Sequence, residues 1–125
     1  MDLDGKRVVV IGGSSGIGLA TAKAAAAEGA AVVIASSNKG RVDEALKGLA
    51  TVSEGRVLDV RNEDAVRELF DEIGAFDHLV YSAGERLTVR ELGMLNLDDA
   101  REFFEARYWG ALAAVKYGKI GRAHV

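Results

Sequence analysis

The 125-residue sequence predicts an α/β fold, a doubly wound parallel sheet of about four strands and four helices. Short apolar runs alternate with segments of helical periodicity, which is typical of consecutive βαβ units. The apolar runs are continuous, as in strands that are buried on both faces. A strand, a glycine turn and a helix start also follow one another directly at residues 8–28. Together these features indicate a sheet with helices on both faces.

The expected strands are short and rich in β-branched residues. They occupy residues 7–11, 31–35, 56–58 and 78–81. Each is followed by a turn that contains glycine, serine or aspartate. In parallel sheets of this kind, ligands lie beyond the carboxyl ends of the strands, where the strand order reverses. We therefore expect the turns at 12–18, 36–38 and 82–84 to converge on one crevice.

The expected helices follow these strands. An alanine-rich helix occupies residues 17–28 and a second helix residues 39–49. Asn62 is expected to cap a third helix, with acidic residues in the first turn where the helix dipole favours them. Asp98 is expected to cap a last long helix that ends near Gly118. Its expected buried stripe consists of Ala100, Phe103, Phe104, Ala106, Leu112 and Val115.

Composition narrows the class of protein. The net charge of −3 and the scattered basic residues provide no basic surface for nucleic acid. No apolar run is long enough for a membrane span, and the acidic amino terminus lacks the apolar core of a signal peptide, so we expect a cytoplasmic protein with no membrane partner. Cysteine is absent, which excludes disulfides, thiolate nucleophiles and cysteine-based metal sites, and no metal site is expected.

The first turn has the properties of an anion site. Gly12, Gly16 and Gly18 follow the first strand, and glycine allows backbone to approach a ligand closely. The free N–H groups of the next helix carry partial positive charge. The turn is therefore suited to a pyrophosphate. Its spacing, G-x-x-x-G-x-G, differs from that of the P-loop and from the G-x-G-x-x-G dinucleotide fingerprint.

This pattern closely resembles the short-chain dehydrogenase/reductase family, whose first turn reads T-G-x-x-x-G-[IL]-G. Gly12, Gly16, Ile17 and Gly18 match that motif, although Ile11 replaces the threonine. Two further family motifs follow in order. Asp59 and Val60 come after the third strand, and Ser82, Ala83 and Gly84 stand where the family has N-N-A-G or a variant. The resemblance implies a Rossmann-type fold and a nicotinamide dinucleotide cofactor.

The resemblance also implies roles for single residues. Ser14, Ser15 and Ile17 would lie along the pyrophosphate and the adjoining ribose, and Asp59 would face the adenine amino group. Asp59 could instead be a turn former at a strand end, and Gly84 a simple loop glycine. The predicted cofactor-binding residues are Gly12, Ser14, Ser15, Gly16, Ile17, Gly18, Ser36, Ser37, Asn38, Lys39, Asp59, Val60, Ser82, Ala83 and Gly84.

The end of the second strand favours NADP(H) over NAD(H). An acidic residue there would hold the ribose 2′-hydroxyl and repel a 2′-phosphate, but residues 35–41 contain no acid. Ser36, Ser37 and Asn38 can donate hydrogen bonds, and Lys39 and Arg41 supply positive charge. The arginine that NADP-dependent relatives often place at position 37 is missing. The alternative is that this polar segment is only the solvated start of a helix.

No catalytic residue is predicted within these 125 residues. In the family, a Tyr-x-x-x-Lys pair transfers the proton, and none of Tyr81, Tyr108 and Tyr117 has lysine four positions later. Arg107 stands where the family has its active-site asparagine, judged from the glycine at 110. It indicates either a rewired site or a structural arginine that pairs with a neighbouring glutamate or a cofactor phosphate.

Family members are considerably longer, so we expect residues 1–119 to be a partial Rossmann domain that cannot turn over by itself. Residues 120–125 resemble a translated sequencing adapter and are expected to be a non-native tail, which leaves His124 without a function. Uncovered sheet edges and apolar helix faces would then favour self-association of this chain. The complete enzyme is expected to be a homo-oligomer.

The leading hypothesis is the cofactor-binding part of an oxidoreductase that transfers a hydride between NADP(H) and an alcohol or carbonyl compound, a small molecule that the sequence does not specify. A second hypothesis is a non-catalytic dinucleotide-binding or interaction module of the same fold. A third, weaker hypothesis is a nucleotide- or S-adenosylmethionine-binding domain, against which the Ser82–Gly84 turn argues.

Overall fold

The computed structural model describes residues 2–84 and 90–119, and within them a parallel sheet of four strands in the order β3-β2-β1-β4. The strands are β1 (Arg7–Ile11), β2 (Ala31–Ser36), β3 (Ser53–Val57) and β4 (His78–Tyr81). The chain runs outward from β1 to β3 and then returns to place β4 on the other side of β1. The strand order therefore reverses between β1 and β4, as the doubly wound fold requires.

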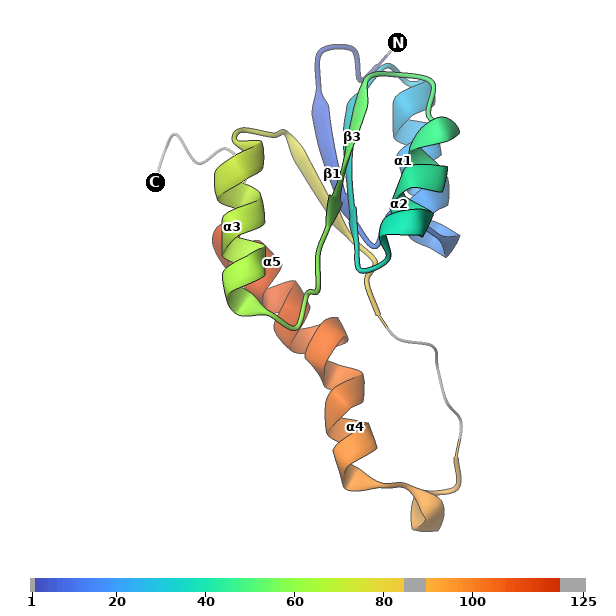
Figure 1. Cartoon of the computed structure of the whole chain (residues 1–125), viewed down its shortest axis with the longest axis vertical. Coiled ribbons are helices and arrows are strands. Elements are labelled where there is room, and N and C mark those ends of the chain that lie inside the picture. Colours follow the sequence, from blue (N-terminus) through green and yellow to red (C-terminus); the bar gives the residue numbers. More distant parts are fainter. Residues whose placement is uncertain (1, 85–89, 120–125) are drawn as a thin grey trace.

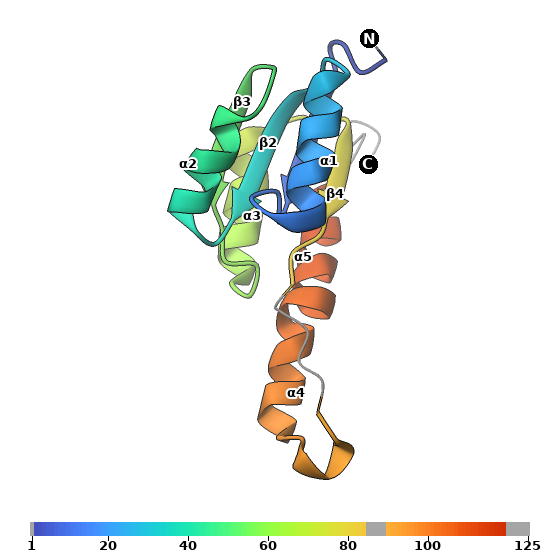
Figure 2. The same cartoon turned by 90° about the vertical axis from the view of Figure 1, so that its right-hand side faces the viewer.

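Helices cover both faces of this sheet (Figure 1). Helices α1 (Gly16–Ala27) and α2 (Lys39–Lys47) pack on one face, and α3 (Glu63–Ile73) and α5 (Ala111–Tyr117) pack on the other (Figure 2). Alternate residues of the central strands supply the two apolar cores. Val8, Val10, Val32 and Ile34 face α1 and α2, whereas Val9, Ile11, Val33 and Ala35 face α3 and α5.

The helix caps follow from the asparagines that precede the helices. The Asn62 side chain accepts a hydrogen bond from the Ala65 N–H at 3.1 Å, which confirms the expected cap of α3. The Asn38 side chain accepts from the Arg41 N–H at 3.0 Å and caps α2 in the same way. Each cap satisfies a backbone donor that the first helical turn leaves unpaired.

Strand β3 begins earlier than the sequence pattern predicts. We expected residues 56–58, but Ser53 and Glu54 already pair with Val32 and Val33 of β2. Strand β3 ends the sheet on this side, so its side chains are only partly buried and need no apolar run. Leu58, which we assigned to the strand, follows it and is buried in the core.

The last helix is divided into three parts. Helix α4 (Leu97–Phe104) continues into a π-helical segment, η2 (Glu105–Gly110), and then into α5. A short 3-10 helix, η1 (Leu92–Met94), precedes them. The cap is Asn96, whose side chain accepts from the Asp98 N–H at 2.8 Å, so the expected cap at Asp98 was wrong by two positions.

The buried face of this helix also differs from the prediction. Ala106 is buried, but Phe104, Leu112 and Val115 are more than half exposed. A π-helical turn contains an extra residue and rotates the helix face that follows it, so a stripe assigned with α-helical spacing no longer matches. The side towards the sheet carries small residues four positions apart, Ala106, Gly110, Ala114 and Gly118, all of them buried.

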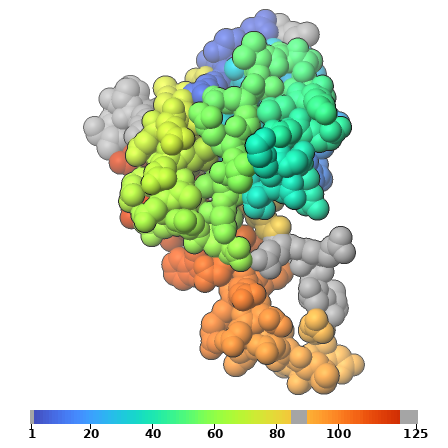
Figure 3. Space-filling view, viewed as in Figure 1, coloured from blue at the N-terminus to red at the C-terminus, as the bar shows by residue number. Residues whose placement is uncertain are grey.

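Helix α4 projects beyond the end of the sheet (Figure 1), and in the space-filling view this part of the chain stands away from the body of the molecule (Figure 3). No helix within residues 2–84 and 90–119 is both long enough and apolar enough to cross a membrane. The tail expected at residues 120–125 lies outside the described residues.

Candidate functional site

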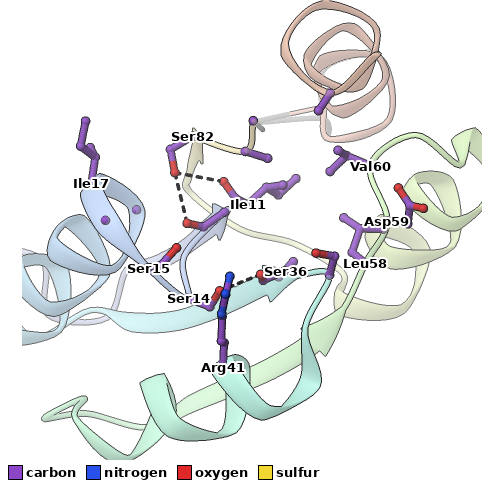
Figure 4. A pocket seen from close by; sticks show the side chains of 18 of the residues that line it. Ile11, Ser14, Ser15, Ile17, Ser36, Arg41, Leu58, Asp59, Val60 and Ser82 are labelled. Atoms are coloured by element: carbon purple, nitrogen blue, oxygen red, sulfur yellow. Dashed lines mark hydrogen bonds between the residues drawn. The ribbon is translucent and has the colours of Figure 1, made fainter. Parts of the chain in front are cut away.

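A cleft of about 420 Å³ lies at the carboxyl ends of the strands (Figure 4). Its walls come from the turn between β1 and α1, from the ends of β2, β3 and β4, and from Ala106 of η2. These segments are far apart in the sequence. They meet because parallel strands end at the same edge of a sheet, and the reversal of strand order leaves room between the connections.

The turn after β1 and the first turn of α1 each require glycine at one position. Gly12 has a φ of +90°, and a Cβ atom placed on it would lie 2.6 Å from the backbone nitrogen of Ala83. At Gly18, a Cβ atom would overlap the carbonyl oxygen of Gly12. The turn is thus pressed against the end of β4, and its backbone lies open to the cleft.

The amino terminus of α1 points its free backbone donors at this cleft. Ser15, the N-cap, has an extended backbone, and its side chain makes no capping hydrogen bond with the described residues. The first turn contains no acidic side chain, and Ile17 is 80% exposed on the cleft wall. Unpaired N–H groups at a helix start attract an anion, so this end of α1 fits a pyrophosphate.

Two serine contacts fix the floor of the cleft. The Ser14 hydroxyl donates to the Ser36 hydroxyl at 2.7 Å, which joins the glycine turn to the end of β2 (Figure 4). The Ser82 hydroxyl lies 3.4 Å and 3.3 Å from the carbonyl oxygens of Ile11 and Gly12. The first and the last of the converging turns are therefore held together by side chains as well as by backbone packing.

Asp59 is both a turn former and part of the cleft wall. Its carboxylate accepts the backbone N–H of Arg61 at 3.0 Å and also binds the Arg61 guanidinium, with Nε at 3.0 Å and Nη2 at 3.1 Å. These hydrogen bonds hold the pKa of Asp59 below its usual value. The two alternative roles considered for Asp59 are thus compatible, because one oxygen can close the turn while the residue still borders the cleft.

The structure brings most of the predicted cofactor residues together. Asn38 and Lys39 are the exceptions: Asn38 caps α2, Lys39 forms an ion pair with Asp43 at 2.7 Å, and neither borders the cleft. Arg41 borders it instead. The predicted residues that line the cleft are Gly12, Ser14, Ser15, Gly16, Ile17, Gly18, Ser36, Ser37, Asp59, Val60, Ser82, Ala83 and Gly84.

Sequence reasoning did not assign Arg61 or Ala106 to the cleft. Arg61 could have been found from its position two residues after Asp59, since a carboxylate at a strand end often closes such a turn. No feature of the sequence placed Ala106 at the cleft, because its position depends on the π-helical segment. Within the described part of the chain, no group of three or more histidine, aspartate or glutamate side chains is placed to hold a metal ion.

The π-helical segment is attached to the sheet by Tyr81. The Tyr81 hydroxyl donates to the carbonyl oxygen of Ala106, and a Cβ atom on Gly110 would collide with the same hydroxyl. Burial raises the pKa of Tyr81 to about 12, so its hydroxyl remains protonated at neutral pH. On the outer side of the segment, Trp109 is 57% exposed and packs edge-on against the Tyr108 ring, with the ring centroids 4.9 Å apart.

A model of the short chain dehydrogenase family matches residues 6–117 of the sequence. The chain belongs to the short-chain dehydrogenase/reductase family. It is 37% identical over 131 residues to the short-chain dehydrogenase/reductase ATR9 of Stachybotrys chlorohalonatus, an alignment that covers 93% of this chain and 49% of that protein. It is 34% identical to the 3-dehydrosphinganine reductase TSC10A of Arabidopsis thaliana, covering 89% of this chain and 35% of the relative.

Solved structures agree with this family assignment. An NAD⁺-bound xylitol dehydrogenase superposes with a TM-score of 0.90 at 27% identity, covering 94% of this chain and 48% of that one. The structure of a short chain dehydrogenase/reductase family protein gives a TM-score of 0.87 at 29% identity, covering 94% and 49%. The chain spans about half the length, or less, of the relatives in both comparisons.

Proposed function

We propose that this short-chain dehydrogenase/reductase chain binds NADP(H) in the cleft and forms the cofactor-binding part of an oxidoreductase that transfers a hydride between NADP(H) and an alcohol or carbonyl compound. The observation that carries the proposal is the start of α1, where an uncapped helix terminus and a glycine turn face the cleft. A dinucleotide pyrophosphate is the ligand that this arrangement suits. When bound, the cofactor supplies or accepts the hydride.

The preference for NADP(H) rests on the wall beside β2. Ser36, Ser37 and Arg41 line it, and no carboxylate among the described residues of this wall stands where it would repel a 2′-phosphate. Arginine binds phosphate through charge-assisted hydrogen bonds. Asp59, the acid on the neighbouring strand end, is neutralised by Arg61. Because the NAD⁺-bound xylitol dehydrogenase has the same fold, cofactor choice must depend on such side chains.

Arg41→Met tests this preference. We expect the variant to bind NADPH at least tenfold more weakly and NADH within about twofold of the unmodified chain, because only NADPH has the 2′-phosphate that the guanidinium would bind. The measurement is a fluorescence titration of each reduced cofactor into the chain.

Lys39→Met is the matched control, since it removes an equal charge two residues away on the same helix. Lys39 does not border the cleft, so both affinities should stay close to those of the unmodified chain. If both variants lost the same affinity for NADPH, the effect of Arg41→Met would come from the change in overall charge and not from a contact with the 2′-phosphate. Saturable binding of neither cofactor by the unmodified chain would contradict the proposed function itself.

The second candidate is a non-catalytic dinucleotide-binding or interaction module. It is favoured by one observation, the arginine at position 107 in place of the family's asparagine. Cofactor binding is common to both candidates, so hydride transfer distinguishes them. NADPH oxidation with a panel of carbonyl compounds, by a longer product of the same gene that includes this chain, supports the oxidoreductase. Tight NADPH binding without oxidation by that product supports the module.

A further inference from the structure

Arg107 lies at the β4 side of the cleft. A Cβ atom placed on Gly84, which lines the cleft, would be 3.2 Å from Cζ and from Nε of Arg107, so the Arg107 side chain fills the space beside Gly84. Ala106, the residue before it, lines the cleft as well. Arg107 therefore places its charge directly behind this wall.

The surroundings hold this side chain in one orientation. The Arg107 guanidinium stacks on the Phe103 ring with Cζ 3.9 Å from the ring centroid, and Nη1 lies 3.4 Å from the Phe103 carbonyl oxygen. The side chain is half-buried and makes further interactions besides these. Arginine stays protonated in all such surroundings, so the positive charge at this position is permanent.

The proposed binding mode determines which end of the cofactor approaches this charge. The pyrophosphate would lie at α1, next to the central strand β1, and the 2′-phosphate would lie at Arg41, beyond β2. The nicotinamide is attached to the other end of the pyrophosphate. It must therefore extend to the opposite side of β1, which is the side of β4, Gly84 and Arg107.

The two redox forms of the cofactor differ in charge at that end. The oxidised nicotinamide ring is a cation, whereas the reduced ring is neutral, and the phosphates are the same in both forms. A fixed cation beside the ring repels the oxidised form alone. We propose that Arg107 makes this cleft bind NADPH more tightly than NADP⁺. This inference rests on the proposed NADP(H) function.

The experiment compares the dissociation constants of NADP⁺ and NADPH for the 125-residue chain and for Arg107→Met, measured by isothermal titration calorimetry. We expect the unmodified chain to bind NADPH more tightly. In Arg107→Met the ratio of the two constants should fall by about tenfold, because like charges within one cleft repel by an energy of that order at an effective dielectric constant of about 20. Arg107→Lys keeps the charge and should keep most of the ratio.

Arg41→Met serves as the control for long-range charge effects. It should weaken NADPH and NADP⁺ equally, since both have the 2′-phosphate, and should leave their ratio unchanged. An unmodified chain that binds NADP⁺ as tightly as NADPH overturns the inference without any variant. A ratio that stays within twofold in Arg107→Met, or that changes equally in Arg41→Met, also overturns it. Failure of the unmodified chain to bind either form would instead refute the proposed function.

Discussion

At Gly12 the backbone turns away from β1 with a φ of +90°, while Ser82 and Ala83 pass against its Cα atom. Two restrictions meet here, because an L-residue rarely adopts this backbone conformation and no space exists for a side chain. The same crowding brings the glycine turn against the end of β4. The shape of the cleft thus depends on the absence of a methyl group at this position.

We expect Gly12→Ala to lower the free energy of unfolding by more than about 1 kcal/mol and to weaken NADPH binding, since the β1–α1 turn must move away from β4. Urea unfolding followed by circular dichroism measures the first effect. Gly40→Ala is the control. It lies in α2, where a Cβ atom meets Asn38 Oδ1 only at 3.4 Å, and should raise stability by up to about 1 kcal/mol. Equal effects in both variants would contradict the crowding at Gly12.

The sequence predicted those cleft-lining residues that belong to local motifs, namely the glycine turn, Asp59 and the Ser82–Gly84 turn. It did not separate Arg41 from Lys39. Both follow β2 and both carry positive charge, but the start of α2 at Lys39 directs that side chain to Asp43 and leaves Arg41 at the cleft. Such a distinction depends on how the helix is rotated against the sheet, which composition and spacing do not determine.

At the scale of elements, the apolar strands and the cap of α3 were predictable from the sequence. Strands β1 and β4 have the expected bounds, and Asn62 caps α3. The failures are β3, whose side chains are only partly buried and include no apolar run, and the long helix, whose face is rotated by η2. The π-helical segment is adjacent to tertiary contacts with Tyr81 and Val60, and local propensity carries no information about these.

Tyr81→Phe tests how strongly the sheet holds this segment. Removing the hydroxyl leaves the Ala106 carbonyl without its donor, so the free energy of unfolding at neutral pH should fall by about 1 kcal/mol. The difference in the free energy of unfolding between the two chains should be greatest below pH 10 and should shrink as the pH rises towards 12. Urea unfolding at each pH measures it.

The direction of this pH effect follows from the raised pKa of Tyr81. The unfolded tyrosine ionises near pH 10.0, whereas the folded one ionises at about 12. Ionisation therefore stabilises the unfolded chain between these values, and the stability due to the buried hydroxyl is lost there. A difference between Tyr81→Phe and the unmodified chain that does not change from pH 9 to pH 12 would exclude this titration as its cause.

At the scale of the whole molecule, the last helix carries an exposed apolar surface. The last helix leaves large apolar side chains exposed along α4, η2 and α5, and its amino-terminal half projects beyond the sheet (Figures 1 and 3). Clusters of this kind on a protein surface favour association. The side chains, each more than half exposed, are Leu97, Phe104, Tyr108, Trp109, Leu112 and Val115.

We expect the chain to self-associate at micromolar concentration and Leu112→Glu to shift it towards the monomer, because the charge would be buried in the contact without a partner. Sedimentation velocity over a concentration series measures the change. Val52→Glu is the control, since Val52 is 86% exposed and lies outside the long helix. An unmodified chain that stays monomeric at all concentrations would contradict this expectation. An equal response to both substitutions would show that the exposed side chains of the last helix do not form the contact.

Trp109 gives the molecule an optical probe for the proposed cofactor. It is the single tryptophan of the chain and lies two residues from Arg107, on the π-helical segment η2, whose residue Ala106 borders the cleft. A reduced nicotinamide absorbs light in the range where tryptophan emits, and an oxidised one does not. We therefore expect a reduced cofactor bound in the cleft, but not an oxidised one, to quench the emission of Trp109 by energy transfer, so that a single fluorophore would report the redox state of the proposed cofactor.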